Sequence, residues 1–397
     1  MGSSASASVA GSGGAFEFAT PERIAFGPGV VSRAGTLVRS LGHRVLLVTG
    51  RNVLRADPVR DSFRKAGLDW VEFAVTGEPT VSDAEAGATL ALAEKADCVL
   101  ACGGGAVVDA GKAIAALATH PGDPFRFLEI IGQGLPLENA PLPFLAVPTT
   151  AGTGAEATRN AVLTSPGHSL KVSLRSPRMV PRVALIDPEL ALGLPADLTA
   201  CTGLDALTQL LEPWVGSKAN GMTDACCREG LPRVARSLGR AVADGHDLGA
   251  RSDLAYAALL SGLALAHSGL GAVHGLAGPI GGRFPAPHGA VCAALLGPVW
   301  RANVDTLRNS DPHHPALQRY QQAARWLTGN PGAAIDDGLR WITDSVAGWK
   351  VPRLARYGLT PTDFPALAQA AQASSSMKGN PIRLPDAVLQ QALAEAL

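Results

Sequence analysis

The sequence predicts an α/β domain built on a parallel sheet, followed by an all-α domain. In the first half of the chain, short apolar runs rich in β-forming residues alternate with helical patterns. Continuous apolar strands separated by helices are typical of a parallel sheet that is covered on both faces. After Asp187-Pro188 the chain carries long segments rich in Ala and Leu, with helical periodicity and few strand signals.

Each predicted strand is a short apolar run, and each predicted helix is a segment with helical periodicity. The strands are expected at 44–48, 70–75, 98–102, 143–147 and 183–187, and the helices among them at 82–96 and 106–119. Four helical segments follow in the second half, at 206–215, 253–266, 318–327 and 386–397.

Turn-forming residues in 187–197 separate the two patterns and place the domain boundary there. The chain therefore divides into a flexible leader (1–15), an α/β domain (16–190) and a helical domain (191–397). One continuous domain with a helical lobe is the alternative.

The composition fits a globular enzyme and gives no sign of a charged partner. The chain has 34 basic and 34 acidic side chains among 397 residues, so its charge draws it neither to nucleic acid nor to a membrane surface. No apolar run approaches the roughly 20 residues that span a bilayer, and the leader SSASASVAGSGG lacks the features of a signal peptide. The six cysteines include no CxxC pair, which favours a reduced, cytoplasmic protein.

Two glycine-rich turns follow predicted strands and suit the binding of phosphate groups. The first, 102–105, has three glycines directly before a helix, where backbone N–H groups are free for a pyrophosphate. It matches neither GxGxxG nor a P-loop, and a plain tight turn is the alternative. The second, 148–160, combines threonines with glycines, the alternative being a capped turn. Two such turns on neighbouring strands fit the ligand site at the carboxyl ends of a doubly wound, Rossmann-like sheet.

A partial metal site is the most informative feature of the second half. Asp205 and Gln209 stand four residues apart and so face the same way on a helix, and His274 and His288 follow later. A carboxylate with two histidines is most of a divalent-metal site, but the fourth group here is an amide. Imidazole is a good ligand for iron or zinc, whereas an amide oxygen is a hard and weak one.

Five motifs occur in order along the chain: CGGGAVVDAGKAIA, VPTTAGTGAEATRN, KVSLRSPRMVPRVALIDPEL, TGLDALTQLLEPWVGSKAN and GLGAVHGLAGPIGGRFPAPHG. From about Phe16 to the C-terminus, the chain resembles the iron-containing (group III) alcohol dehydrogenase family. That family includes maleylacetate reductases and is related to dehydroquinate synthase. The resemblance implies a dehydroquinate synthase-like fold, with a nicotinamide cofactor and a metal in the cleft between the domains.

The resemblance also implies which residues bind the cofactor. Gly104, Gly105 and Asp109 would hold the pyrophosphate, and Glu78 with the next two residues would lie near the adenosine. The phosphates, ribose or nicotinamide would be contacted by five polar residues: Thr149, Thr150, Thr153, Asn160 and Lys171.

The choice between NAD(H) and NADP(H) turns on the end of the first long strand. Gly50 stands where NAD-preferring relatives carry an acid that accepts the ribose 2′-hydroxyl. Arg51 beside it can accommodate a 2′-phosphate instead, which favours NADP(H). Arg51 as a plain solvated loop residue is the alternative.

In metal-dependent members of the family the ligands are Asp, His, His and His. Asp205, His274 and His288 match the first, third and fourth, and Gln209 takes the place of the second. Three retained ligands could hold Zn²⁺ or Fe²⁺, with Gln209 or water completing the shell. The sequence leaves the metal occupancy open.

Gly278 is a second departure, because many alcohol-active members have a proton-relaying histidine there. His267, seven residues before His274, is a candidate for that role, the alternative being a polar residue at a helix end. Arg283 is a candidate for electrostatic help because it lies near His288 in the sequence. Without metal, His274, His288 or His267 would supply the proton and stabilise the oxyanion.

The sequence therefore predicts a nicotinamide-dependent oxidoreductase that interconverts a small carbonyl compound and its alcohol, either alcohol dehydrogenase-like or maleylacetate reductase-like. Two other functions stay open. One is a lyase or cyclase of the dehydroquinate synthase type, in which bound NAD is not consumed, and the other is a nucleotide-binding member without turnover. We expect a homodimer that acts on a small molecule, with neither nucleic acid nor membrane as a partner.

Overall fold

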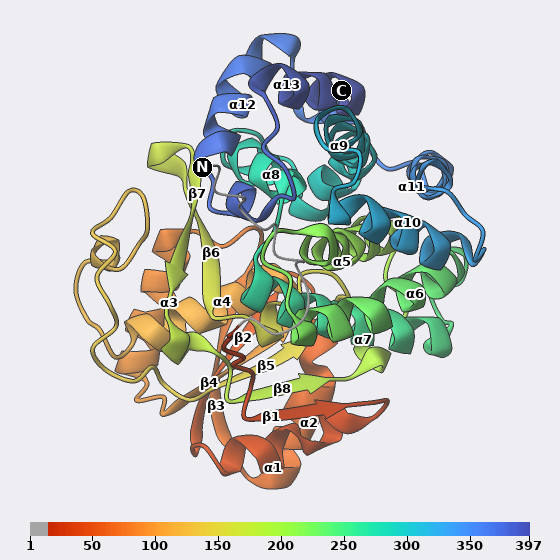
Figure 1. The fold of residues 1–397 in the computed structure, drawn as a ribbon. Helices are drawn as coiled ribbons and strands as arrows, with labels where there is room; N and C mark the ends of the chain where they lie inside the picture. The colour runs from red at the N-terminus through yellow and green to blue at the C-terminus, as the bar shows by residue number, and fades with distance from the viewer. Residues whose placement is uncertain (1–14) are drawn as a thin grey trace.

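The first half of the chain forms a parallel sheet. The computed structural model describes residues 15–397, so that nearly all of the predicted leader lies outside it. Six strands form one parallel sheet in the order β1-β8-β5-β4-β2-β3 (Figure 1). Their bounds are β1 (Arg23–Phe26), β2 (Arg44–Gly50), β3 (Asp69–Val75), β4 (Cys98–Gly103), β5 (Phe144–Pro148) and β8 (Val183–Ile186). The predicted parallel sheet is confirmed.

Helices cover both faces of this sheet, which explains the apolar strands. The four residues Val45–Val48 at the centre of β2 are each 0% exposed, as expected for a strand buried on both faces. One face packs on α1 (Ala34–Arg39) and α2 (Asp57–Ala66), and the other on α3 (Val81–Ala93) and α4 (Gly105–Leu117).

A two-stranded hairpin leaves the sheet and reaches the helical half. Strands β6 (Asn160–Ser165) and β7 (Leu170–Arg175) pair antiparallel. The hairpin packs against α8 of the helical half, where Gly282 allows a close approach. A Cβ at Gly282 would lie 3.0 Å from the Leu170 Cα.

The second half is helical, and its hydrophobic core extends to Ala151, Ala157, Ala184 and Ile186 of the first half. Its helices are α5 (Ala196–Val215), α6 (Gly221–Ala243), α7 (Leu248–Ser268), α8 (Ala272–Arg283), α9 (His288–Ser310), α10 (Pro315–Thr328), α11 (Ile335–Gly348), α12 (Phe364–Ala373) and α13 (Asp386–Ala396). None of the described helices is by itself long and apolar enough to cross a membrane; α7 and α8 together are, but the chain bends by 98° between them.

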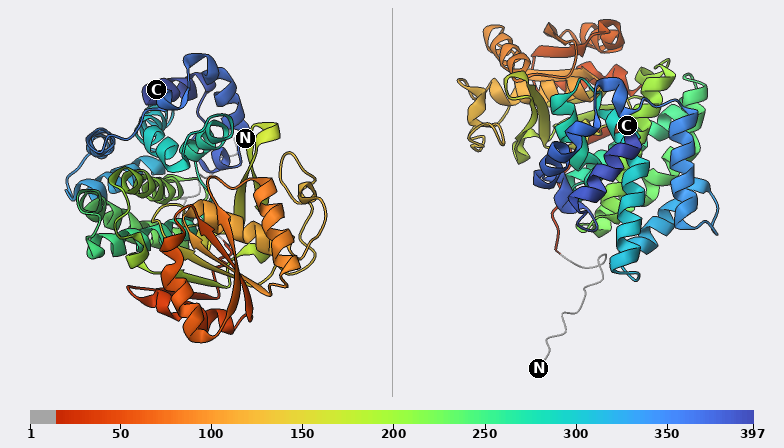
Figure 2. Two further views of the ribbon diagram at one scale, coloured as in Figure 1. Left: turned by 180° about the vertical axis from the view of Figure 1, so that it is seen from behind. Right: turned by 90° about the horizontal axis from the view of Figure 1, so that it is seen from above.

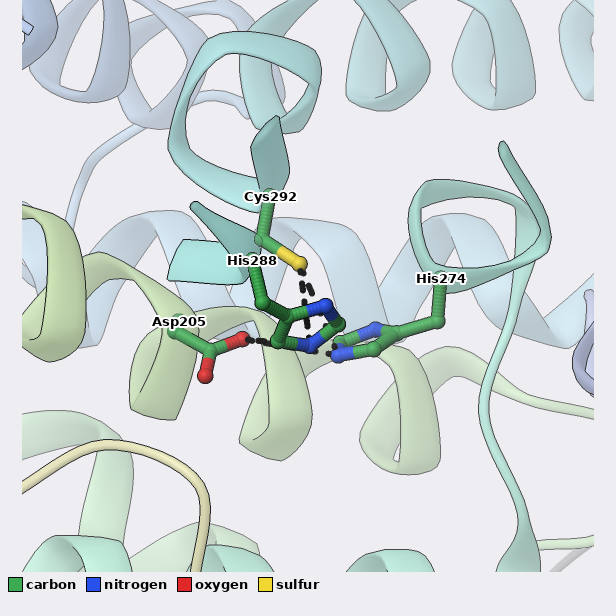
Figure 3. Close-up of side chains that lie close together, drawn as sticks. All are labelled: Asp205, His274, His288 and Cys292. Carbon is green, nitrogen blue, oxygen red and sulfur yellow. Dashed lines mark hydrogen bonds and ion pairs between the residues drawn. The ribbon is translucent and has the colours of Figure 1, made fainter. Parts of the chain in front are cut away.

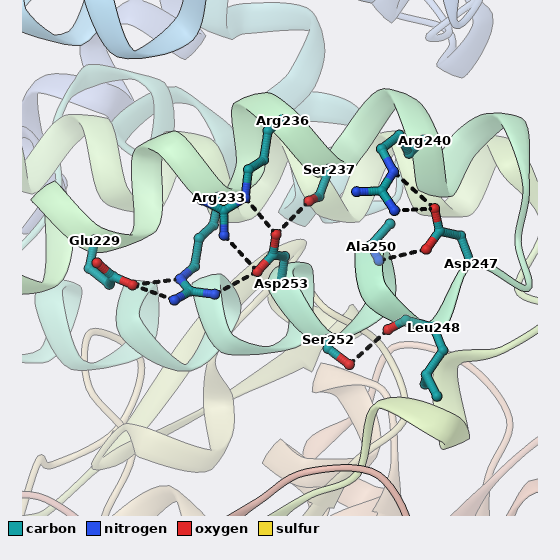
Figure 4. A network of polar contacts seen from close by, with 10 residues as sticks. All are labelled: Glu229, Arg233, Arg236, Ser237, Arg240, Asp247, Leu248, Ala250, Ser252 and Asp253. Atoms are coloured by element: carbon teal, nitrogen blue, oxygen red, sulfur yellow. Dashed lines mark hydrogen bonds and ion pairs between the residues drawn. The ribbon is translucent and has the colours of Figure 1, made fainter. Parts of the chain in front are cut away.

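A network of ion pairs and hydrogen bonds links α6 to α7 on the outside of the helical half (Figure 4). Asp253 of α7 accepts hydrogen bonds from Arg236 Nε and Ser237 Oγ of α6, each at 2.7 Å. Arg233 joins the same carboxylate and also pairs with Glu229. Burial alone would raise the pKa of Asp253, but the hydrogen bonds from Arg236, Ser237 and Arg233 outweigh it and lower the pKa.

The two halves lie side by side (Figure 2) and meet where a glycine-rich turn contacts a helix without intervening side chains. Gly154, in the turn after β5, has a left-handed φ of 59°. A Cβ on Gly262 of α7 would lie 2.2 Å from the Gly154 carbonyl oxygen, and a Cβ on Gly154 would lie 2.5 Å from the Gly262 Cα. No L side chain fits on either side of this contact.

Candidate metal centre and nucleotide site

Four side chains from three helices of the second half converge on one point (Figure 3). Asp205 comes from α5, His274 from α8, and His288 and Cys292 from successive turns of α9. Asp205 Oδ1 lies 3.5 Å from His274 Nε2 and 3.7 Å from His288 Nε2. Cys292 Sγ lies 3.7 Å and 3.6 Å from the same two nitrogens. The four potential ligand atoms all lie within 4.8 Å of one another.

The donor set fits a divalent metal ion. Asp205 is 1% exposed, and its Oδ1 accepts no hydrogen bond from any residue in 15–397. A buried carboxylate oxygen without a partner is costly unless a cation or water satisfies it. Two imidazoles, a carboxylate and a sulfur are ligands of zinc and iron rather than of magnesium or calcium.

The charges of the cluster support one another even without an ion. Burial alone would raise the pKa of Asp205, but the two imidazoles outweigh it and lower the pKa to about 2. Burial likewise opposes the charge of His274, yet Cys292 and the acidic neighbours raise its pKa well above the usual value. The pKa of His288 is raised mainly by Cys292. A bound cation would take the place of these imidazole protons.

A buried carboxylate behind the cluster sets the orientation of His274. Glu212 Oε2 lies 2.7 Å from His274 Nδ1, and Glu212 Oε1 accepts a 2.7 Å hydrogen bond from the Val273 N–H. The contact leaves Nε2 of His274 facing Asp205. Metal-binding histidines commonly have such a partner on the second ring nitrogen. The sequence analysis assigned a role to neither Glu212 nor Cys292.

Gln209, which the resemblance put in a ligand's place, joins the cluster to the second glycine-rich turn. Its Nε2 lies 3.5 Å from the Gly152 carbonyl oxygen, and its Oε1 lies 3.4 Å from Ser261 Oγ. It also makes a small contribution to the lowered pKa of Asp205. The amide therefore has polar partners on the side of the nucleotide turn.

The two glycine-rich turns lie against each other at the ends of β4 and β5. Helix α4 starts after Gly104 with no side-chain cap among the described residues, so the first N–H groups of α4 are available to an anion. A Cβ on Gly105 would lie 2.6 Å from Thr153, and one on Gly104 would lie 3.4 Å from Thr150. The strand order changes direction between β2 and β4, where a doubly wound sheet binds its ligand.

Asp109 and Lys112, both on α4, hold the second glycine-rich turn (148–160) in place from the protein interior. Lys112 Nζ lies 3.2 Å from Asp109 Oδ1 and donates to the Ala155 carbonyl oxygen at 3.0 Å and to Thr158 Oγ1 at 2.8 Å. It also donates to the carbonyl oxygen of Asn160. Asp109 Oδ2 in turn accepts a hydrogen bond from the backbone of β6. The carboxylate predicted to serve the pyrophosphate is thus engaged within the protein.

Lys171 and Glu78 are brought together as a pair. Lys171 Nζ lies 3.1 Å from Glu78 Oε2, and a Cβ on Gly281 of α8 would meet the Lys171 side chain at 3.3 Å. The pair therefore links the hairpin, the start of α3 and the helix that carries His274.

Three further positions from the sequence analysis contribute no side chain to the four-residue cluster. His267 stacks on Phe18 with ring centroids 4.1 Å apart, and its Nε2 accepts a 2.8 Å hydrogen bond from the Ala19 N–H. Arg283 is exposed at the end of α8. At Gly278 a Cβ would meet no described atom within 4 Å, so the missing histidine leaves open space.

At the end of β2, Arg51 is exposed and donates through Nη2 to the Thr76 carbonyl oxygen at 2.9 Å. A Cβ on Gly50 would lie 3.3 Å from Val107 Cγ2. A larger residue at position 50 thus needs only a small adjustment of the Val107 side chain.

Comparison with known proteins places both halves of the chain in one family. The family model for iron-containing alcohol dehydrogenase matches residues 21–188, and the model for the C-terminal part of the Fe-containing alcohol dehydrogenase family matches 199–397. The 1,3-propanediol dehydrogenase of Citrobacter freundii is 35% identical over 377 residues, which cover 92% of this chain and 95% of that enzyme.

Solved structures support the same family assignment. A crystal structure of 1,3-propanediol oxidoreductase matches with a TM-score of 0.89 and 32% identity, covering 96% of this chain and 100% of that one. The sulfoacetaldehyde reductase of Bifidobacterium kashiwanohense, in complex with NAD⁺, matches with a TM-score of 0.84 and 26% identity over 97% of this chain and 99% of that one. The chain belongs to the iron-containing alcohol dehydrogenase family and is a nicotinamide-dependent oxidoreductase that interconverts a small carbonyl compound and its alcohol.

Proposed function

We propose that this enzyme reduces a small aldehyde with NADPH, or oxidises the corresponding alcohol with NADP⁺, at a site formed by the α5–α8–α9 cluster. The observation that carries the proposal is the contact between the nucleotide turn and α5. Gly152 packs on Thr202, where a Cβ would lie 3.0 Å from the Thr202 Cβ, one turn before Asp205. The cofactor's reactive end would therefore lie beside the metal ligands.

Asp205, His274 and His288 would hold the metal ion of the family. A divalent metal, when bound, polarises the oxygen of the substrate while hydride passes to or from the nicotinamide. Glu212 fixes the ring of His274, and the free N–H groups of α4 bind the pyrophosphate. The open space at Gly278 leaves room for water to carry the proton that a histidine relays in other members.

The preference for NADP(H) rests on Gly50 and Arg51. Without a carboxylate at position 50, the 2′-phosphate of NADP(H) meets no negative charge there. The exposed guanidinium of Arg51 is free to turn from the Thr76 carbonyl to a phosphate.

The test is a substrate panel measured by nicotinamide absorbance with the full chain, metal supplied and then chelated. Short aldehydes, a hydroxyaldehyde and an unsaturated oxo-dicarboxylate are each offered with NADPH and with NADH. Oxidation of NADPH with an aldehyde, faster than with NADH, supports the proposal. Turnover with the dicarboxylate alone identifies a maleylacetate reductase-like enzyme. A substrate consumed without net change of cofactor indicates a lyase or cyclase, and no reaction at all indicates a member without turnover.

We also propose a cytoplasmic homodimer. All six cysteines are free, which is usual in a reducing compartment. The edge strand β1 carries Ile24 and Phe26, which are 38% and 36% exposed, and an apolar sheet edge favours pairing with a second copy. Light scattering checks the mass, and the double change Ile24→Lys with Phe26→Lys is expected to give monomers.

A further inference from the structure

We propose that Cys292 Sγ is the fourth metal ligand of this enzyme, in place of the amide of Gln209. The resulting shell of Asp205, His274, His288 and Cys292 prefers zinc to iron. The inference deepens the proposed function, since it concerns the metal of the same site.

The position of Cys292 follows from helix geometry. Residues four apart on a helix lie on the same face, one turn after the other, so Cys292 presents its sulfur where His288 presents its ring (Figure 3). Both residues lie on α9, and Cys292 is 0% exposed. No rearrangement of the backbone is needed to bring the sulfur to the imidazoles.

The distances match a tetrahedral shell. Donor atoms that bind one zinc ion at about 2.0–2.3 Å in tetrahedral arrangement lie roughly 3.3–3.6 Å apart. The sulfur lies 3.7 Å from His274 Nε2 and 3.6 Å from His288 Nε2. Asp205 Oδ1 lies 3.5 Å and 3.7 Å from the same nitrogens, so four of the six distances between donor atoms are close to those of a tetrahedral shell, and the other two are within 4.8 Å.

Asp205 Oδ1 lies at ion-pair distance from both imidazoles yet accepts no hydrogen bond among residues 15–397, which is an independent sign of a cation at this point. A thiol next to two imidazoles could be explained by hydrogen bonds alone, but such bonds leave Asp205 Oδ1 buried and unsatisfied among residues 15–397. A metal ion at the centre of the four atoms satisfies the oxygen and the sulfur together.

The chemistry of the fourth ligand sets the choice of metal. A thiol loses its proton to solvent when it binds a metal as thiolate. Thiolate is a soft ligand that selects zinc, whereas an amide oxygen is hard and weak. A shell of carboxylate, two imidazoles and one thiolate therefore favours Zn²⁺ over Fe²⁺, although most of the chain matches an iron-containing family.

The experiment measures metal ligation in the full chain without substrate or cofactor. X-ray absorption of the zinc-loaded protein is expected to show one sulfur neighbour at about 2.3 Å, and the Co²⁺-loaded protein a sulfur-to-cobalt charge-transfer band in the near ultraviolet. Both signals should vanish in Cys292→Ser, with a loss of zinc affinity of roughly 100-fold or more. Cys227→Ser, at another buried free cysteine of the helical half, is the matched control and should change neither.

Gln209→His tests the exchange of ligands. Alone, it should change zinc affinity little, because the fourth place is already taken. Combined with Cys292→Ser, it should recover most of the lost affinity and lower the preference for zinc over iron by about tenfold.

A zinc-loaded protein with only nitrogen and oxygen neighbours overturns the inference, and so does unchanged zinc affinity in a folded Cys292→Ser. If that variant does not fold, the X-ray absorption spectrum of the zinc-loaded wild type decides by itself whether a sulfur binds the metal. A sulfur ligand without turnover of any substrate refutes the proposed function only, and turnover by a zinc-loaded protein that shows no sulfur neighbour refutes this inference only.

Discussion

Glu212 and His274 form a buried hydrogen bond of 2.7 Å that leaves the other ring nitrogen of the histidine facing Asp205. The two residues are 62 positions apart in the chain, and Glu212 also accepts from the backbone N–H of Val273. The carboxylate thus fixes both the ring and the start of the helix that carries it.

Replacing Glu212 by Gln should weaken metal binding by about 10–100-fold, because an amide stabilises the required ring orientation less than a carboxylate does. Competition with a chelator measures the zinc affinity. Glu229→Gln, at an exposed acid of α6, serves as the control. Equal affinities in the Glu212 variant and the wild type would show that His274 needs no such support.

Gly50→Asp should convert the enzyme from NADP(H) to NAD(H). The new carboxylate would accept the ribose 2′-hydroxyl and repel a 2′-phosphate, and the Cβ needs only a small shift of Val107. We expect the ratio of kcat/KM for NADH over NADPH to rise about tenfold or more. Gly167→Asp, in the hairpin turn, adds the same charge elsewhere and should leave the ratio alone. A wild type that already prefers NADH would refute the reasoning.

Asp109→Asn should destabilise the protein by about 2–4 kcal/mol, because it leaves the buried charge of Lys112 without its acid. Denaturant unfolding measures the change. Asp61→Asn removes an exposed pair with Arg64 and should cost less than about 1 kcal/mol. Comparable losses in the two variants would mean that the buried pair contributes no more than a surface pair.

Glu156→Gln should stabilise the protein at pH 8 more than at pH 5. Burial raises the pKa of Glu156 from 4.5 to about 7 in the folded state, despite its own backbone N–H and Lys112. A carboxyl with a raised pKa favours folding below its unfolded pKa and loses that contribution as the pH rises from about 4.5 to about 7. The amide has no such dependence, so we expect a gain of about 1–3 kcal/mol at pH 8. Thermal unfolding at both pH values decides, and a gain that is larger at pH 5 contradicts the argument.

The sequence predicts strands well where burial of the strand produces a long apolar run. The five predicted strands are all present to within two residues at either end. The four inner strands are uninterrupted apolar runs because they are covered on both faces, whereas β3, at the sheet edge, has only Val75 buried. Strand β1 was not predicted, since only Ala25 of its four residues is buried. The hairpin was also missed, although its first strand alternates buried and half-buried residues.

The site could be predicted only as far as spacing along the chain reveals it. Asp205, His274 and His288 were singled out, and the structure brings them together. The fourth member, Cys292, had a signal in its spacing of four from His288. Glu212 had none, because its carboxylate reaches His274 from 62 positions away in the chain, and no local pattern encodes that approach.

The contact of Gly154 with Gly262 has a consequence for motion. With backbone on backbone and no side chain between them, the contact has nothing that can compress or change rotamer. We expect it to act as a fulcrum, about which the sheet and the helices rotate when substrate enters and product leaves. Gly152 of the same turn packs on Thr202, one turn before Asp205, so the spacing between the nucleotide turn and the metal ligands should change least.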